Sequence, residues 1–164
     1  MHDELIDQMA TVPKTLAHLV AEASDARLDA THDGEWSSRT LLAHFRDDEY
    51  LCMRVALERM LAETQPTVHF IEGTDWEPSR NRTRDRKEVL LADFALQRQA
   101  SISILRGLRE EDWLRMGVRG GHRFGIRQLV EGWIGHDRDH VAQLEAALGE
   151  TIREVKARRA RMAD

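Results

Sequence analysis

The sequence contains little cysteine and proline and no long hydrophobic run. Cys52 is the single cysteine among 164 residues, which excludes an intramolecular disulfide, a CxxC zinc site and a cysteine-ligated iron–sulfur cluster. No apolar stretch approaches the roughly 18 residues that a membrane-spanning helix requires. The first residues are acidic, whereas a secretory signal begins with positive charge. These features predict a cytoplasmic protein that does not associate with membranes.

Several sequence motifs of common enzyme classes are also missing. There is no GxxxxGK[ST] or GxGxxG for phosphate or dinucleotide binding, no GxSxG elbow, no HExxH and no Glu-x-x-His of a di-iron bundle. The net charge of −5 argues against nucleic acid as a partner. The sequence does have eight histidines, and these carry most of the functional information.

Helical periodicity dominates the hydrophobic pattern. We expect a short helical piece over 3–10 and long helices over about 11–23, 37–62, 83–108 and 126–148, with Pro13 as a start signal and Gly149 as a C-terminal cap. Residues 63–82 are predicted to form a long loop, and glycines interrupt the helical pattern over 117–125. This pattern predicts one all-α four-helix-bundle domain over 1–150 with one long crossover, followed by a basic helical tail over 151–164.

Three histidines interrupt apolar stripes that should face the interior of the bundle. His136 and His140 are spaced i, i+4, so they share one helix face. His44 lies between Leu41 and Leu51 in the predicted inward stripe of the second long helix, which continues to Val55. Imidazoles in this arrangement suit a divalent cation. Neutral, hydrogen-bonded core histidines remain the alternative, and they would need a partner for each ring.

Nearby polar residues supply candidates for the surroundings of such a site. Asp48 follows His44 by one turn and is expected to orient a ligand ring or a water, or to pair with an arginine at the bundle edge. Gln97 and Ser101 fall within the apolar stripe of the third long helix and suggest a wet cavity or a buried hydrogen-bonded pair. Asp137 and Asp139 are interpreted as surface or dimer-contact charges. Cys52 is interpreted as core filling.

Two segments resemble the signatures of the DinB-like, YfiT-like superfamily. The first is Trp36-Ser37-Ser38-Arg39 followed by Leu42-Ala43-His44-Phe45-Arg46-Asp47-Asp48-Glu49, and the second is Trp133-Ile134-Gly135-His136-Asp137-Arg138-Asp139-His140-Val141-Ala142-Gln143-Leu144. Glu111-Asp112-Trp113 lies between them. The resemblance implies an up-down-down-up bundle, a divalent metal site at His44, His136 and His140, and a homodimer.

Better-understood members of this superfamily use low-molecular-weight thiols such as bacillithiol or mycothiol. The resemblance therefore suggests a metal-dependent thiol S-transferase acting on a small molecule, with a metal-dependent hydrolase or a non-catalytic metal-binding stress-response protein as alternatives. Zinc and nickel are the favoured ions, with manganese and iron also compatible. Arg119, Arg123 and Arg127 are sequence candidates for holding an anionic group of the cofactor.

Overall fold

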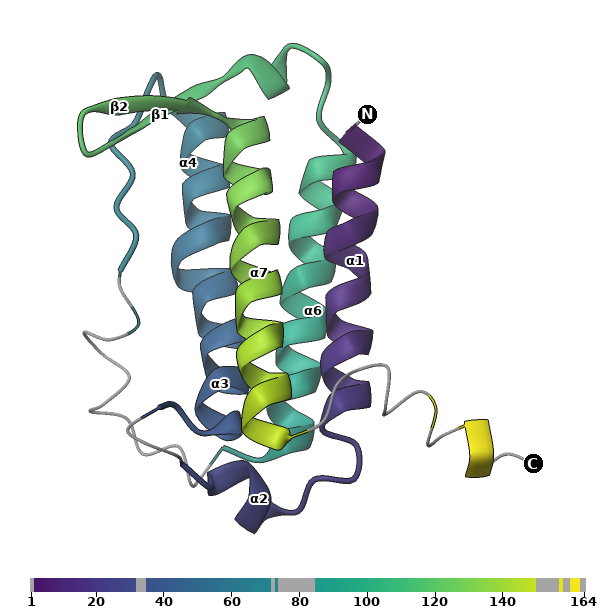
Figure 1. Cartoon of the computed structure of the whole chain (residues 1–164). Helices are drawn as coiled ribbons and strands as arrows, with labels where there is room; N and C mark the ends of the chain where they lie inside the picture. Colours follow the sequence, from purple (N-terminus) through teal and green to yellow (C-terminus); the bar gives the residue numbers. More distant parts are fainter. Residues whose placement is uncertain are drawn as a thin grey trace.

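The computed structural model describes residues 2–31, 35–71, 73, 85–149, 157 and 160–162. Its long elements are α1 (His2–Leu19), α3 (Ser38–Asp48), the π-helix η1 (Glu49–Arg54), α4 (Val55–Ala62), α6 (Lys87–Arg106) and α7 (Ile126–Leu148). Helices α3, η1 and α4 form one continuous rod, which runs alongside α6 in the same direction, while α1 and α7 run in the opposite direction (Figure 1). The predicted all-α bundle and its up-down-down-up order are confirmed. None of the described helices is long and apolar enough to cross a membrane.

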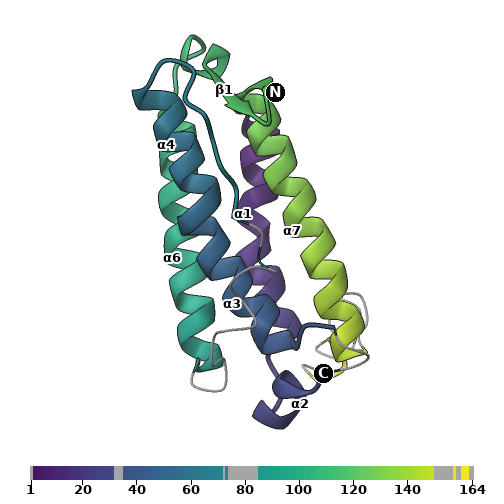
Figure 2. The same cartoon turned by 90° about the vertical axis from the view of Figure 1, so that its left-hand side faces the viewer.

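The long crossover follows from this order, because the chain must return along the whole bundle between α4 and α6 (Figures 1 and 2). Its first part is attached to a β-hairpin made of β1 (Met116–Arg119) and β2 (His122–Gly125). Thr67 pairs with Val118, and the Val68 N–H donates to the Val118 carbonyl at 2.8 Å. The sequence had predicted only a glycine-rich break here.

Glycines explain both the hairpin and the end of the last helix. Gly120 and Gly121 have φ values of 55° and 81°, as a two-residue hairpin turn requires. Gly149 closes α7 with φ 60°, so the predicted bounds of this helix and its cap are confirmed. The third long helix begins at Lys87, after the extended Arg86, and not near Thr83 as predicted. Most of the predicted tail over 151–164 lies outside the described residues.

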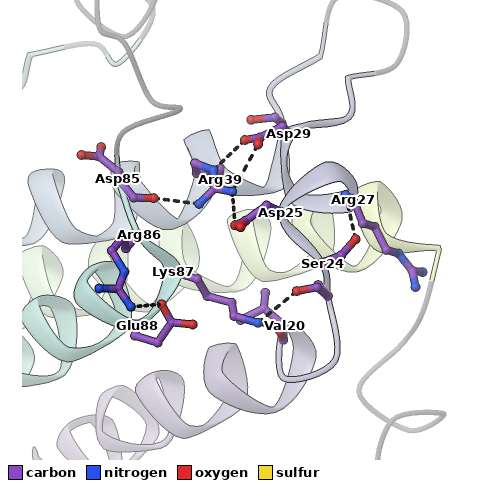
Figure 3. A network of polar contacts seen from close by, with 12 residues as sticks. Val20, Ser24, Asp25, Arg27, Asp29, Arg39, Asp85, Arg86, Lys87 and Glu88 are labelled. Atoms are coloured by element: carbon purple, nitrogen blue, oxygen red, sulfur yellow. Dashed lines mark hydrogen bonds and ion pairs between the residues drawn. The ribbon is translucent and has the colours of Figure 1, made fainter.

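Ionic contacts close the end of the bundle opposite the hairpin (Figure 3). Buried Arg39 donates to Asp25 and Asp29 of the short helix α2 (Asp25–Asp29) at 2.7 and 2.6 Å, and also to the Asp85 carbonyl at 2.7 Å. Lys87 donates to backbone carbonyls that follow α1, among them that of Val20 at 3.0 Å. These contacts hold α2, the rod and the start of α6 together at this end of the bundle.

A buried ion cluster centred on Arg98 connects all four bundle helices. The Arg98 side chain is 1% exposed. Its Nε donates to Glu49 of the rod at 2.9 Å, and its Nη1 and Nη2 donate to the two carboxylate oxygens of Asp137 on α7 at 2.6 and 3.0 Å. Nη1 also donates to the Met9 carbonyl of α1 at 3.2 Å. The guanidinium lies 4.9 Å from the ring centroid of Phe94 and 5.5 Å from that of Trp133.

Burial and the charge of Arg98 shift the pKa values of the two carboxylates in this cluster in opposite directions. Burial opposes ionisation of Asp137, but hydrogen bonding with His136 and the charge of Arg98 outweigh it, so the Asp137 pKa lies below its ordinary value. Burial raises the pKa of Glu49 against the opposing effect of Arg98. Two carboxylates share one guanidinium, and Asp137, whose two oxygens both accept from it, is the one whose pKa is lowered.

The Met9 contact explains why the predicted start of a helix at Pro13 is wrong. The helix α1 is continuous from His2 to Leu19 with Pro13 inside it. Proline has no N–H, so the carbonyl four residues earlier, that of Met9, loses its backbone donor. Arg98 supplies a donor to that carbonyl at 3.2 Å.

The predicted inward stripe of the rod is correct only up to Asp48. Leu51 and Val55 are 43% and 39% exposed. The inward positions are instead one residue later, beginning with Cys52 and Ala56, which are 2% and 0% exposed. The π-helix η1 inserts one extra residue into the turn, so every later position is rotated relative to a regular 3.6-residue period. Cys52 is buried, as predicted.

We predict that Arg98→Met lowers the free energy of unfolding by about 3–5 kcal/mol, because it leaves the carboxylates of Glu49 and Asp137 buried without their cation. Urea unfolding followed by circular dichroism measures this loss. Arg106→Met on the same helix is the control, since the Arg106 side chain is 54% exposed and exposed ion pairs contribute only about 0–1 kcal/mol. Equal losses for the two variants would contradict the prediction.

Candidate metal centre

The structure brings together the three histidines that the sequence singled out. Helix α3 supplies His44, and one face of α7 supplies His136 and His140 one turn apart. One nitrogen from each ring lies within 4.8 Å of the other two. The Nε2 atoms of His44 and His136 are 3.0 Å apart. His44 is buried, and the other two are half-buried.

The surroundings of His140 favour its neutral form with Nε2 available. Its Nδ1 lies 2.7 Å from Oε1 of Gln143, so Nδ1–H donates to the amide oxygen and the lone pair is on Nε2. Burial and the charge of His136 lower the pKa of His140. The Trp36 ring lies nearly parallel to the His140 imidazole, with their centroids 6.2 Å apart. The hydrogen bond to Gln143 therefore holds the His140 ring in an orientation that suits a metal ligand.

His136 has a carboxylate on each side. Behind it, Asp137 Oδ1 is 3.8 Å from Nδ1. In front of it, Asp48 Oδ2 is 3.3 Å from Nε2, the nitrogen that faces His44. The interpretation of Asp137 as a surface or dimer-contact charge is wrong: it is 3% exposed and bound to Arg98. Asp139 is exposed.

The other candidates differ in how close they come to the histidines. Asp48 lines the same cavity as the three rings, whereas neither Gln97 nor Ser101 is among the described residues that line it. Ser101 is 0% exposed, and its hydroxyl donates to the Gln97 carbonyl at 3.2 Å. The two alternatives predicted for Gln97 and Ser101 were a wet cavity and a buried hydrogen-bonded pair. The structure fits the second, although the acceptor is the backbone carbonyl of Gln97.

A cavity of about 1330 Å³ opens in front of the histidines. The rod and α7 form two of its walls, and Phe70, Ile71 and Gly73 of the crossover lie across it. A Cβ at Gly73 would be 2.6 Å from the Trp36 ring and 3.0 Å from the His44 ring, so the backbone here lies close against both rings and a larger residue would require the Trp36 ring to shift. The crossover therefore covers part of the site.

The residues present fit a divalent ion. Three imidazole nitrogens converge from two rigid helices, and a ring nitrogen of His140 that points away from the cluster already has its acceptor in Gln143. Among the described residues no fourth histidine or cysteine joins the cluster, as is typical of sites with an open coordination position. All-imidazole ligands suit zinc and nickel, and also manganese and iron.

Behind the three histidines lie polar residues that the helical pattern did not single out, although the sequence contains a signal for them. Arg98 lies four residues after Phe94 and four before Ile102, so it interrupts a buried stripe of α6 as the histidines do on their helices. Asp137 lies four residues after buried Trp133. Opposite charges on the buried faces of two helices predict an internal ion pair. Gln143, three residues after His140, is within reach on the same face.

The lowered pKa of His140 gives a prediction about pH. Folding opposes protonation of this ring, so the free energy of unfolding of metal-free protein should fall as the pH drops through about 6.5, the ordinary histidine value. His140→Gln should remove part of this fall, and His69→Gln, which changes an exposed side chain, should not. Urea unfolding at about pH 7.5 and about pH 5.5 tests this. The same pH dependence in wild type and His140→Gln would refute it.

Comparison with known proteins agrees with this architecture. The family model of the DinB superfamily matches residues 8–144. Among solved structures, the chain is similar to YfiT from Bacillus subtilis, described as a probable metal-dependent hydrolase with an unusual four-helix bundle topology, with a TM-score of 0.80 and 18% identity over 92% of this chain and 89% of that one. A comparison with curated protein sequences finds no match. The family match spans most of the chain, and this protein therefore belongs to the DinB superfamily.

Proposed function

We propose that His44, His136 and His140 bind a divalent metal ion and that the protein is a metal-dependent enzyme acting on a small molecule. The observation that carries this proposal is the position of the three ligand nitrogens, within 4.8 Å of one another, on the wall of a cavity of about 1330 Å³. Exposed residues such as His122 and Gln143 also line that cavity, so it reaches solvent. A purely structural metal site would be closed by its ligands.

In this proposal the attacking group is a thiol or a water supplied from outside the chain. The described residues that line the cavity include no cysteine, serine, threonine, lysine or tyrosine. An ion held by three imidazoles supplies an open position that acidifies a thiol or a water. Asp48 Oδ2 lies 3.3 Å from Nε2 of His136 and is placed to accept the proton that is released.

The reaction that we propose is transfer of a low-molecular-weight thiol to an electrophile. The sulfur loses its proton to Asp48, the S–C bond forms, and the leaving group departs with the electron pair of the broken bond. The volume of about 1330 Å³ exceeds the roughly 300–1,000 Å³ of a pocket for one drug-sized ligand. It therefore has room for both a thiol and its acceptor.

Hydrolysis is the second candidate, and Asp48 is the observation that favours it. A carboxylate 3.3 Å from a ligand nitrogen suits proton transfer from an attacking water as well as from a thiol. The similar protein YfiT is described as a probable metal-dependent hydrolase. A non-catalytic metal-binding role in a stress response is the third hypothesis. The cavity, which reaches solvent, disfavours it.

We predict about one divalent ion per chain in protein purified without a histidine tag. His140→Ala should lose most of it, because two ligands bind far more weakly than three. His69→Ala, which changes an exposed residue, is the matched control and should retain the ion. Elemental analysis by mass spectrometry gives the metal content, and full occupancy in His140→Ala would refute the assignment.

The same preparations distinguish the two reactions. Metal-loaded protein is given a panel of thiols, including bacillithiol and mycothiol, with a haloaromatic electrophile, and separately a panel of esters and amides without thiol. We expect conjugation to depend on a thiol and to fall at least tenfold in His44→Ala. Equal conjugation rates for wild type and His44→Ala with every thiol would exclude the transferase. Hydrolysis that is lost in His44→Ala would then establish the second candidate.

We also propose a homodimer in the cytoplasm. The π-helix turns Tyr50, Leu51 and Val55 outward, with exposed fractions of 51%, 43% and 39%, and a second copy would remove this apolar surface from water. Light scattering should give twice the chain mass of 18.9 kDa. Leu51→Lys should reduce this to a single chain, whereas Leu96→Lys on α6, where Leu96 is 73% exposed, should not. A wild-type mass equal to one chain would refute the dimer.

A further inference from the structure

The cavity continues along α7 on both sides of the three histidines. On this helix its lining begins at Gln128, before His136, and ends at Ala147, after His140. Between Gln128 and Ala147 the helix rises about 28 Å at 1.5 Å per residue, and the two histidines lie near the middle of that span. They therefore divide the cavity into two parts, one toward the hairpin and one toward α2.

The part toward the hairpin, the hairpin-side lobe, has walls from four segments of the chain. The rod contributes Met53, the crossover Phe70, the hairpin Phe124, and α7 contributes Leu129, Gly132 and Trp133. Figure 2 shows the described part of the crossover running between the rod and α7. The part toward α2, the α2-side lobe, is lined by smaller side chains, namely Ala30, Ala146 and Ala147.

The hairpin-side lobe is an indentation in the hydrophobic core. Met53, Leu129 and Trp133 belong to one buried cluster, and Phe70 and Phe124 pack against that cluster. Trp133 is 1% exposed, and its indole N–H donates to Glu49 at 3.1 Å, so its polar group is already satisfied within the core. A ligand group in this lobe therefore meets ring and hydrocarbon surface from several elements, which favours an apolar group.

Polar residues lie at the rim of this lobe. Arg119, His122 and Gln128 line the cavity and are exposed. The Arg119 guanidinium lies over the Phe70 ring, 4.5 Å from its centroid, and this contact holds the ring at the wall of the lobe. The charge of Arg119 thus supports an aromatic wall, and the inner surface of the lobe is apolar.

Gly132 keeps the hairpin-side lobe open beside the histidines. It lies inside α7, where glycine weakens a helix, and a Cβ at this position would meet nothing within 4 Å. It precedes His136 by one turn on the same face, so a side chain here would project into the lobe. Gly135 also has open space around its Cβ but does not line the cavity. Close packing explains neither glycine, and only Gly132 affects the space beside the metal ligands.

We propose that the hairpin-side lobe binds a bulky apolar group of the substrate, aromatic or of similar size, and that Gly132 is the residue that admits it. The group is part of the electrophile that accepts the thiol, and the α2-side lobe then takes the thiol. Both roles rest on the proposed function, whereas the binding of an apolar group in the hairpin-side lobe does not. Gly132 is accordingly a specificity-determining residue.

Titration calorimetry of metal-loaded protein with two uncharged aromatic alcohols, benzyl alcohol and the larger naphthylmethanol, tests the binding. We expect naphthylmethanol to bind at least threefold more tightly, because it buries more apolar area. Gly132→Leu should weaken its binding at least fivefold. Gly135→Leu, outside the cavity, and Ala147→Leu, in the α2-side lobe, are the controls and should leave its affinity within about twofold.

Folding of the glycine variants is checked by thermal unfolding. Gly132→Leu and Gly135→Leu should both raise the midpoint, because leucine favours a helix interior over glycine; a loss of binding in Gly132→Leu then reflects the filled lobe. The proposal fails if wild type binds neither alcohol at millimolar concentration, if Gly132→Leu binds them as wild type does, or if Ala147→Leu weakens binding as much as Gly132→Leu.

His44→Ala distinguishes the lobe from the metal centre. Binding of naphthylmethanol should persist in this variant within about threefold, since the probe's apolar group contacts the lobe and not the histidines. Binding that is lost in His44→Ala would show that the probe's hydroxyl is held at the metal centre, and it would overturn the proposal.

Kinetics of thiol transfer test the role of the lobe in the reaction. With a naphthyl-bearing electrophile, Gly132→Leu should raise KM for the electrophile at least fivefold and leave KM for the thiol within about twofold. A rise in KM for the thiol alone would overturn the assignment of the two lobes. If wild type shows no transfer but binds naphthylmethanol in a Gly132-dependent way, the proposed function fails and the binding site stands. Transfer that is insensitive to Gly132→Leu would remove this proposal and leave the proposed function.

Discussion

The compensation of one buried positive charge organises this bundle. Arg98 is enclosed by groups from the other three bundle helices: Glu49 of the rod, Asp137 of α7 and the Met9 carbonyl of α1. A guanidinium in a low-dielectric interior tolerates little displacement from its partners. The heights of the four helices relative to one another are therefore coupled to this contact. Since Asp137 is the next residue after His136, the same contact sets where α7 presents its two histidines to His44.

Different residues face the two sides of the three-histidine cluster. Behind the rings, Gln143 and Asp137 face nitrogens that point away from the cluster. In front, Asp48 and the open cavity face the nitrogens that converge. In the proposed enzyme, the groups behind the rings would orient them and the groups in front would meet the substrate. This arrangement separates the residues that stabilise the site from those that can take part in a reaction.

The sequence was sufficient to identify the three histidines that converge and most helix bounds, because both depend on local patterns. His44, His136 and His140 each interrupt a hydrophobic stripe, and Gly149 caps α7 by its backbone conformation alone. The misplaced elements depend on partners distant in sequence. Pro13 remains inside α1 because a donor 85 residues later, Arg98, replaces its missing N–H. Asp137 turned out to be buried because its cation lies on another helix, which a helical wheel of α7 alone does not include.

The π-helix also affects how this chain is compared with its relatives. Between His44 and Met60 the rod contains one residue more than a regular helix would use to bring the same two side chains to the same faces. A relative whose corresponding helix is entirely α-helical reaches the equivalent of Met60 one residue earlier. An alignment without a gap over residues 49–54 would then pair exposed Val55 with the inward position that Ala56 occupies here. After the π-helix, residues that occupy the same place in the two structures therefore differ by one position from residues that an ungapped alignment pairs.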